Sequence, residues 1–185
     1  MKNNNNTALW ILVITVNVAI WATILAYCSI SNRPIKKVEK LSEKALYLLV
    51  ENPSSINVLS ETKPQRFYGN QLLTDEEQDD INASMTRLNQ TIMKRTANFT
   101  NFDDADQEVT DLMQRHMNTV TSLQSLMSTV NIADKKDDKF AGWKQKIEYT
   151  AVSNNGIPYR SQFWFFFDKD GDILTRSFEI PLMDS

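Results

Sequence analysis

Several residue types are scarce in this sequence of 185 residues, and each scarcity argues against a class of structure or function. The single cysteine, Cys28, permits no disulfide within the chain, so the burial of apolar surface must hold the fold together. Four glycines and five prolines are too few for a loop-rich chain and are typical of one built mainly from long helices. A net charge of −3 leaves no concentrated basic surface for phosphates, which argues against nucleic acid as a partner.

The residues that usually carry chemistry are also few. His116 is the one histidine and there is no pair of cysteines, so zinc sites and histidine-based catalytic triads lack their parts. Because His116 falls on the apolar face of a predicted helix, we interpret it as a packed, hydrogen-bonded residue. The sequence therefore predicts a protein that is not an enzyme, with no catalytic residue, no metal site and no cofactor.

The longest apolar segment covers residues 8–30, contains no charge and comes after a short polar tail, residues 1–7. At about 1.5 Å per residue, a helix over this segment exceeds the roughly 30 Å hydrocarbon core of a bilayer. Trp10 and Tyr27 lie near its ends, where aromatic rings favour the headgroup level, and a cleavable signal normally has a shorter apolar core. We predict an uncleaved, single-pass transmembrane anchor in the lipid bilayer.

Cys28 allows an alternative interpretation of the same segment. Together with Leu25 and Ala26 it resembles the lipobox of a bacterial lipoprotein signal, in which the cysteine becomes acylated. Tyr27 departs from that pattern, because the residue before a lipidated cysteine is normally small. We therefore favour Cys28 as a small interfacial residue of the anchor.

The anchor carries residues that are typical of helix association in a membrane. Thr15, Ala19, Ala22 and Ala26 recur at spacings of four, three and four, which would let a second helix approach closely. The side-chain amide of Asn17 is costly in hydrocarbon unless it finds a hydrogen-bonding partner. These residues predict a possible homo-oligomer through the anchor, although threonine and alanine are common in any membrane helix.

The charges around the anchor bear on which side of the membrane the domain lies. Only Lys2 precedes the anchor, and five basic residues come after it: Arg33, Lys36, Lys37, Lys40 and Lys44. The positive-inside rule then places the domain in the cytoplasm. Short anchors near a Met-Lys N-terminus, however, usually export the domain behind them, and we favour the extracytoplasmic side, which is the periplasm in a bacterium.

Periodicity and capping signals predict three helices after the anchor. A juxtamembrane helix covers residues 31–52, and a loop-like stretch, residues 53–73, comes next. Thr74 with Glu77 forms a capping box that opens a second helix over residues 75–97. A third helix over 103–131 carries an apolar face and should pack against the second as an antiparallel hairpin.

From residue 143 the apolar period changes from that of a helix to that of a strand. The turn signals Asn155-Gly156 and Asp170-Gly171 divide this segment into strands over residues 143–152, 159–168 and 172–180. Residues 163–167 are apolar on both faces, so the middle strand should be central. We predict a single α+β domain, residues 53–185, with the helical hairpin packed on one face of a three-stranded antiparallel meander.

Two acidic segments resemble cation sites but have simpler explanations. Residues 168–172 resemble the start of a calcium loop, yet the glycine stands at position four of the segment, where a hairpin turn needs it, and not at position six. The acidic residues of 75–80 fall in the first turns of a helix, where its dipole favours negative charge. Three N-glycosylation sequons, at Asn82, Asn89 and Asn98, lie in an Asn- and Thr-rich stretch in which such triplets arise by chance.

The segment Arg33-Pro34-Ile35-Lys36-Lys37-Val38 after the anchor, with Asp75-Glu76 later at the start of a helix, resembles the two-helix HAMP linker of bacterial signalling receptors. The resemblance covers residues 31–95 and implies a cytoplasmic signal relay. The connector is long for that family, the family's glycine after the acidic residue is missing, and the sequence shows neither a sensor domain nor a membrane helix before the anchor.

These observations lead to one functional hypothesis and two alternatives. We predict a membrane-anchored interaction or assembly module that docks a protein partner through a sheet edge or the helical hairpin. The first alternative is the HAMP-like relay. The second is a small membrane-tethered enzyme whose site is assembled from dispersed acids or hydroxyls.

Overall fold

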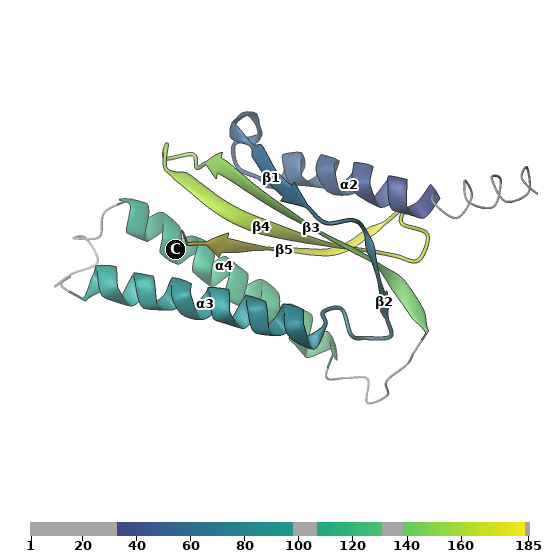
Figure 1. Ribbon diagram of the computed structural model, residues 1–185. Helices are drawn as coiled ribbons and strands as arrows, with labels where there is room; N and C mark the ends of the chain where they lie inside the picture. The colour runs from purple at the N-terminus through teal and green to yellow at the C-terminus, as the bar shows by residue number, and fades with distance from the viewer. Residues whose placement is uncertain (1–32, 98–106, 131–138, 184–185) are drawn as a thin grey trace, which may run out of the picture.

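The structure is a computed structural model that describes residues 33–97, 107–130 and 139–183. Its elements form three layers, with an antiparallel sheet between one helix and a helical hairpin (Figure 1). Helix α2 (Arg33–Leu49) covers one face of the sheet. The hairpin of α3 (Asp75–Thr96) and α4 (Gln107–Val130) packs on the other side. The predicted α+β class is confirmed, with three described helices.

The sheet contains the predicted meander and two further strands. Strands β3 (Phe140–Val152), β4 (Pro158–Phe167) and β5 (Leu174–Leu182) pair in succession, all antiparallel. Strands β1 (Asn57–Glu61) and β2 (Gln65–Tyr68) both pair with β3, after a short 3-10 helix, η1 (Pro53–Ser55). The prediction of three strands is therefore wrong in number. The stretch predicted as a loop, residues 53–73, contains both additional strands. They can lie one after the other along the same side of β3, because β3 is 13 residues long.

Helices cover both faces of the sheet, which corrects the prediction that they pack on one face. Residues 163–167 of β4 are all buried, as expected for a central strand. Their alternate side chains point to opposite faces, so each face needs its own cover. On one face, Val38 and Leu46 of α2 pack with Phe163, Phe165 and Phe167. On the other face, the buried residues are Phe67, Leu73, Ile81, Leu126, Trp164, Phe166, Phe178 and Ile180.

Local signals in the sequence place the helix starts and the turns well. The Thr74 hydroxyl accepts a hydrogen bond from the Glu77 backbone N–H at 3.2 Å, and the Glu77 carboxylate accepts one from the Thr74 N–H at 2.7 Å. This confirms the predicted capping box at the start of α3. The predicted third helix begins four residues before α4, in a segment outside the described residues.

The β4–β5 connection is the predicted hairpin turn. One carboxylate oxygen of Asp168 accepts the backbone N–H groups of Asp172 and Ile173, at 2.9 and 3.1 Å. Gly171 has a φ of +70°, which favours glycine. The turn also contacts α2, because Lys37 forms an ion pair with Asp172 at 2.7 Å.

No helix among residues 33–97, 107–130 and 139–183 is both long and apolar enough to cross a membrane. The predicted anchor, residues 8–30, lies outside the described residues. So do its five helix-packing residues, Thr15, Asn17, Ala19, Ala22 and Ala26, and also Cys28.

Candidate functional site

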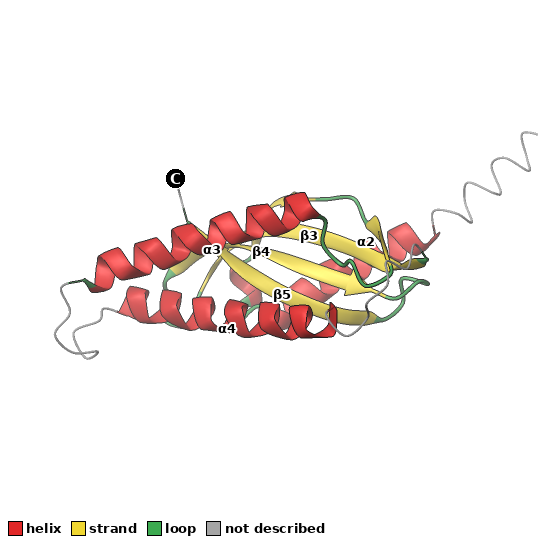
Figure 2. Cartoon of the chain, turned by 90° about the horizontal axis from the view of Figure 1, so that it is seen from below, coloured by secondary structure: helices red, strands yellow, loops and turns green. Residues whose placement is uncertain are grey.

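The two edges of the sheet differ in how they are covered. Helix α4 runs beside β5, the last strand on one side (Figure 2). The buried hydroxyl of Thr119 in α4 donates a hydrogen bond to the backbone carbonyl of Glu179 in β5, at 2.9 Å. This bond uses an acceptor that an edge strand would otherwise offer to another chain. Helix α4 therefore closes the β5 edge.

The opposite edge, formed by β1, is open. Among the described residues, no strand pairs with the outer side of β1, and all five of its residues are exposed. Two of them are large and apolar: Val58 is 41% exposed and Leu59 is 46% exposed. An open strand with exposed apolar side chains is a template for a further strand.

The pairing of β3 shows which of its backbone groups face β1. The N–H of Lys146 donates to the Thr62 hydroxyl at 3.0 Å, and the N–H of Val152 donates to the Ser55 hydroxyl at 2.9 Å. Thr62 returns a backbone bond to the carbonyl of Lys146 at 2.9 Å. In this part of β3, the even-numbered residues therefore point their backbone groups toward β1.

The same alternation determines which groups of β1 are available to a partner. Asn57 and Ser60 lie opposite even-numbered residues of β3 and use their backbone groups within the sheet. Val58 and Glu61 lie opposite odd-numbered residues, so their N–H and C=O groups point away from β3. The register shifts between Val58 and Ser60, which places a bulge at Leu59. An added strand must match this bulge, which restricts the sequences that pair here.

A second notable feature is a buried polar cluster around Arg115 of α4. Arg115 is only 7% exposed, and its guanidinium lies near three carboxylates from three parts of the chain. The nitrogen–oxygen distances are 2.9 Å to Asp111, 3.4 Å to Glu51 and 3.5 Å to Glu179. The guanidinium carbon also lies 3.6 Å from the ring centre of Tyr159. This cation joins α4 to the sheet and to the segment after α2.

Tyrosine side chains complete the cluster. The Tyr149 hydroxyl donates to the Glu179 carboxylate at 2.8 Å. Burial raises the pKa of Tyr149, and the Glu179 carboxylate raises it further. Burial lowers the pKa of Arg115, but the hydrogen bond to Asp111 and the charge of Glu179 outweigh this, so the net shift of the pKa is upward. Both shifts favour the ordinary charge states of these two side chains, a charged Arg115 and a neutral Tyr149, as in a structural contact between layers.

This cluster was not predicted from the sequence, although one signal for it exists. The predicted packing face of the third helix included His116, which is half-buried. The buried polar side chains described in α4 are Arg115 and Thr119, and with Asp111 they recur every four residues beside the apolar stripe. Arg115 has its ion pair with Asp111 within α4. A polar i, i+4 ladder bordering an apolar helix face was therefore the available signal.

A second buried ion pair ties β3 to the start of α3. Lys144 is almost fully buried, and its ammonium group contacts the Glu77 carboxylate. The same carboxylate accepts the backbone N–H of Thr74 in the capping box. Glu77 therefore both caps α3 and compensates the charge of a buried lysine, as buried cations require.

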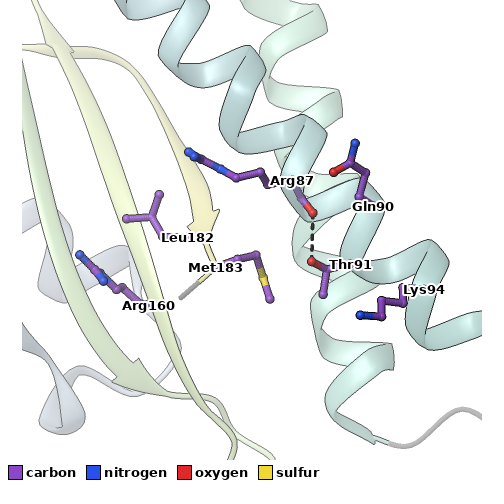
Figure 3. Close-up of a pocket in the computed structure, with 7 residues that line it drawn as sticks. All are labelled: Arg87, Gln90, Thr91, Lys94, Arg160, Leu182 and Met183. Carbon is purple, nitrogen blue, oxygen red and sulfur yellow. Dashed lines mark hydrogen bonds between the residues drawn. The ribbon is translucent and has the colours of Figure 1, made fainter. Parts of the chain in front are cut away.

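A surface hollow of about 490 Å³ lies between α3 and the ends of β4 and β5 (Figure 3). Its lining residues are Arg87, Gln90, Thr91, Lys94, Arg160, Leu182 and Met183. Arg160 is engaged by the Glu148 carboxylate, with 2.8 Å between Nε and Oε1. Leu182 and Met183 lie between Arg160 and α3 in this view. A specific anion site requires basic groups that converge on one point. The basic residues of this hollow do not converge in that way.

Within the described ranges, no three His, Cys, Asp or Glu side chains are grouped as metal ligands. Comparisons of the chain with family models, with curated proteins and with solved structures gave no match.

Proposed function

We propose that this protein is a membrane-tethered, non-enzymatic docking module that binds an extended segment of a partner protein along β1. The contrast between the two sheet edges carries the proposal. Helix α4 closes the β5 edge with a buried hydrogen bond, while β1 leaves its outer backbone groups and two apolar side chains accessible. Backbone bonds would supply affinity, and the side chains around the Leu59 bulge would supply specificity.

The predicted anchor adds to this mechanism. Two proteins held in one bilayer meet at a high effective concentration, so a short added strand with few contacts is sufficient for association. The sheet edge is suited to a partner in the same membrane, because it needs only an extended segment and no preformed pocket.

The arrangement of the helices favours docking over a helical relay. The two segments that resemble a HAMP linker correspond to α2 and α3. In the structure they pack on opposite sides of the sheet, in separate apolar clusters. A relay through a parallel helical pair requires direct packing between its two helices.

Photo-crosslinking in native membranes tests the proposal. A benzophenone amino acid would replace Leu59 on the open edge and, in a second variant, Met117 on α4, which is also exposed. We expect a discrete adduct from position 59 and none from position 117. Equal yields from both positions would contradict a docking role for β1.

Two substitutions of Glu61 separate backbone from side-chain effects. Glu61→Pro removes an outward N–H without removing a bond to β3, and Glu61→Ala removes only the side chain. Because a lost hydrogen bond leaves a buried carbonyl on the partner, we expect the proline variant to lower the adduct yield by about tenfold. The alanine variant should retain most of the adduct. An undiminished yield with Glu61→Pro would exclude strand addition.

A further inference from the structure

The outer face of α2 is rich in basic residues, of which Lys37 is paired with Asp172 of the β4–β5 turn. The inner face of this helix is buried against the sheet through Val38, Ser42 and Leu46. The helix contains five basic residues and two acidic ones, within a chain whose net charge is −3. The five basic residues are Arg33, Lys36, Lys37, Lys40 and Lys44, and all of them are exposed.

Helical geometry places these charges opposite the core. At about 100° per residue, Arg33 and Lys44 point almost directly away from the buried Ser42. Lys40 lies on the same line, one turn before Lys44. The acidic residues Glu39 and Glu43 lie to one flank of that line, so the outermost ridge of α2 carries positive charge alone.

The same ridge ends in apolar side chains. Tyr47, one turn after Lys44, is 41% exposed, and Leu48 is 74% exposed. Leu48 has the largest exposed fraction among the large apolar residues described. A helix face with several lysines and an exposed aromatic and aliphatic end has the composition of a helix that lies in a membrane interface.

We propose that the outer face of α2 lies on the anionic surface of a lipid bilayer. The lysines would contact lipid phosphates while their alkyl chains lie along the surface, and Tyr47 and Leu48 would enter the interface. A bilayer fits this face better than a protein does, because the apolar segment of the predicted anchor ends at residue 30, three residues before α2 begins. The inference rests on the membrane tether in the proposed function.

This contact would orient the whole domain. Because α2 and the hairpin lie on opposite sides of the sheet, the hairpin would point away from the membrane (Figure 1). The open edge at β1 would then face sideways, toward other proteins of the same bilayer. The membrane contact therefore adds an orientation to the docking role of β1.

Spin-label depth measurements on the full chain in lipid nanodiscs test the inference. Cys28 would be replaced by Ser, and a single cysteine carrying a nitroxide would be placed at Leu48 or at Met93, an exposed residue of α3. In discs containing phosphatidylglycerol, the label at position 48 should lie in the interface and the label at position 93 in water. In phosphatidylcholine alone, the label at 48 should move toward water.

Charge-reversal variants supply the matched control. Each lysine near an anionic surface strengthens association about fivefold, so Lys40→Glu with Lys44→Glu should lower the ratio of docked to undocked α2 by roughly 25-fold or more. Arg87→Glu with Lys94→Glu makes the same charge change on α3, on the other side of the sheet, and should leave the depth at position 48 unchanged. Equal effects of the two pairs would overturn the inference.

A label at Ala19, within the apolar segment, separates the two possible failures. If this label lies in hydrocarbon while the label at position 48 lies in water in both lipids, the docking of α2 is overturned and the membrane tether stands. If the label at Ala19 is also in water, the tether itself fails, and the inference fails with it.

Discussion

At the scale of single residues, Arg115 joins α4 to the sheet and to the segment after α2. It is 7% exposed and faces the carboxylates of Asp111 and Glu179, which are also partly buried. Replacing it with methionine would keep much of its volume but leave these charges uncompensated. We expect Arg115→Met to lower the free energy of unfolding by about 3 kcal/mol, measured by urea denaturation of the full chain in detergent.

A surface ion pair of the same type is the control for this prediction. Arg95 pairs with Glu108 between the two hairpin helices, and their side chains are 38% and 56% exposed. Because water screens such pairs, Arg95→Met should cost less than about 1 kcal/mol. Similar losses for the two arginines would contradict the structural importance of the buried cluster.

The buried Tyr149 predicts a pH dependence of stability. Burial and the charge of Glu179 raise its pKa in the folded state above the ordinary value of about 10. Above that pH the unfolded chain loses the phenol proton while the folded chain keeps it, so the unfolded state binds fewer protons. The contribution of Tyr149 to the free energy of unfolding should therefore be fully present below pH 10 and should decrease as the pH rises further.

Denaturation series on either side of pH 10 would measure this effect. Tyr149→Phe should make the loss of stability above pH 10 shallower, because the variant has no phenol proton to retain. At neutral pH the substitution should cost about 1 kcal/mol, since Glu179 loses one donor but keeps Arg115 nearby. An unchanged slope in the variant would show that Tyr149 ionises equally in both states.

None of these residues was predicted from the sequence to be structurally important. Arg115 stands beside residues of an apolar stripe, but two of its partners, Glu51 and Glu179, each lie 64 residues away in the sequence. No local sequence pattern predicts a contact between residues so far apart in the sequence. Only the contact with Asp111, within one helix, could have been expected from spacing.

At the scale of elements, the packing of α2 against the β4–β5 turn can be tested with two glycines. Gly156 and Gly171 both have positive φ, +79° and +70°. A Cβ at Gly171 would lie 2.9 Å from a Val38 side-chain carbon and 3.0 Å from the Pro34 carbonyl oxygen, whereas nothing lies within 4 Å at Gly156. The two sites therefore share backbone strain but differ in packing against α2.

We expect Gly156→Ala to lower the unfolding free energy by about 1 kcal/mol, the usual cost of a left-handed backbone. Gly171→Ala should cost at least about 1 kcal/mol more, because α2 must shift to relieve the overpacking. Thermal unfolding of both variants measures the difference. Equal losses of unfolding free energy in the two variants would mean that α2 can shift away from the turn without an energetic cost.

The accuracy of the sequence-based prediction differs between elements for a physical reason. The capping box and the glycine turns were predicted because hydrogen bonds between residues a few positions apart define them. Strands β1 and β2 were missed because β1 is exposed on both faces and its sequence shows no burial pattern. Its extended form depends on β3, whose paired residues lie about 90 positions away.

At the scale of the molecule, two layers cover the sheet and one edge stays open. The apolar run at 163–167 predicted a central strand, and it also explains why one helical layer is not enough. Which helix covers which face depends on contacts that no local pattern reports. The same architecture leads to the docking proposal, since α4 closes β5 while β1 has no such neighbour among the described elements.

Amide hydrogen exchange of the full chain, compared between native membranes and detergent, tests the docking role of β1 most directly. In detergent, the outward N–H groups of Val58 and Glu61 should exchange faster than the inward N–H of Ser60. In native membranes, a partner strand should slow exchange at Val58 and Glu61 by about tenfold or more, because each N–H gains a hydrogen bond. Equally fast exchange at these two positions in both preparations would contradict docking at β1.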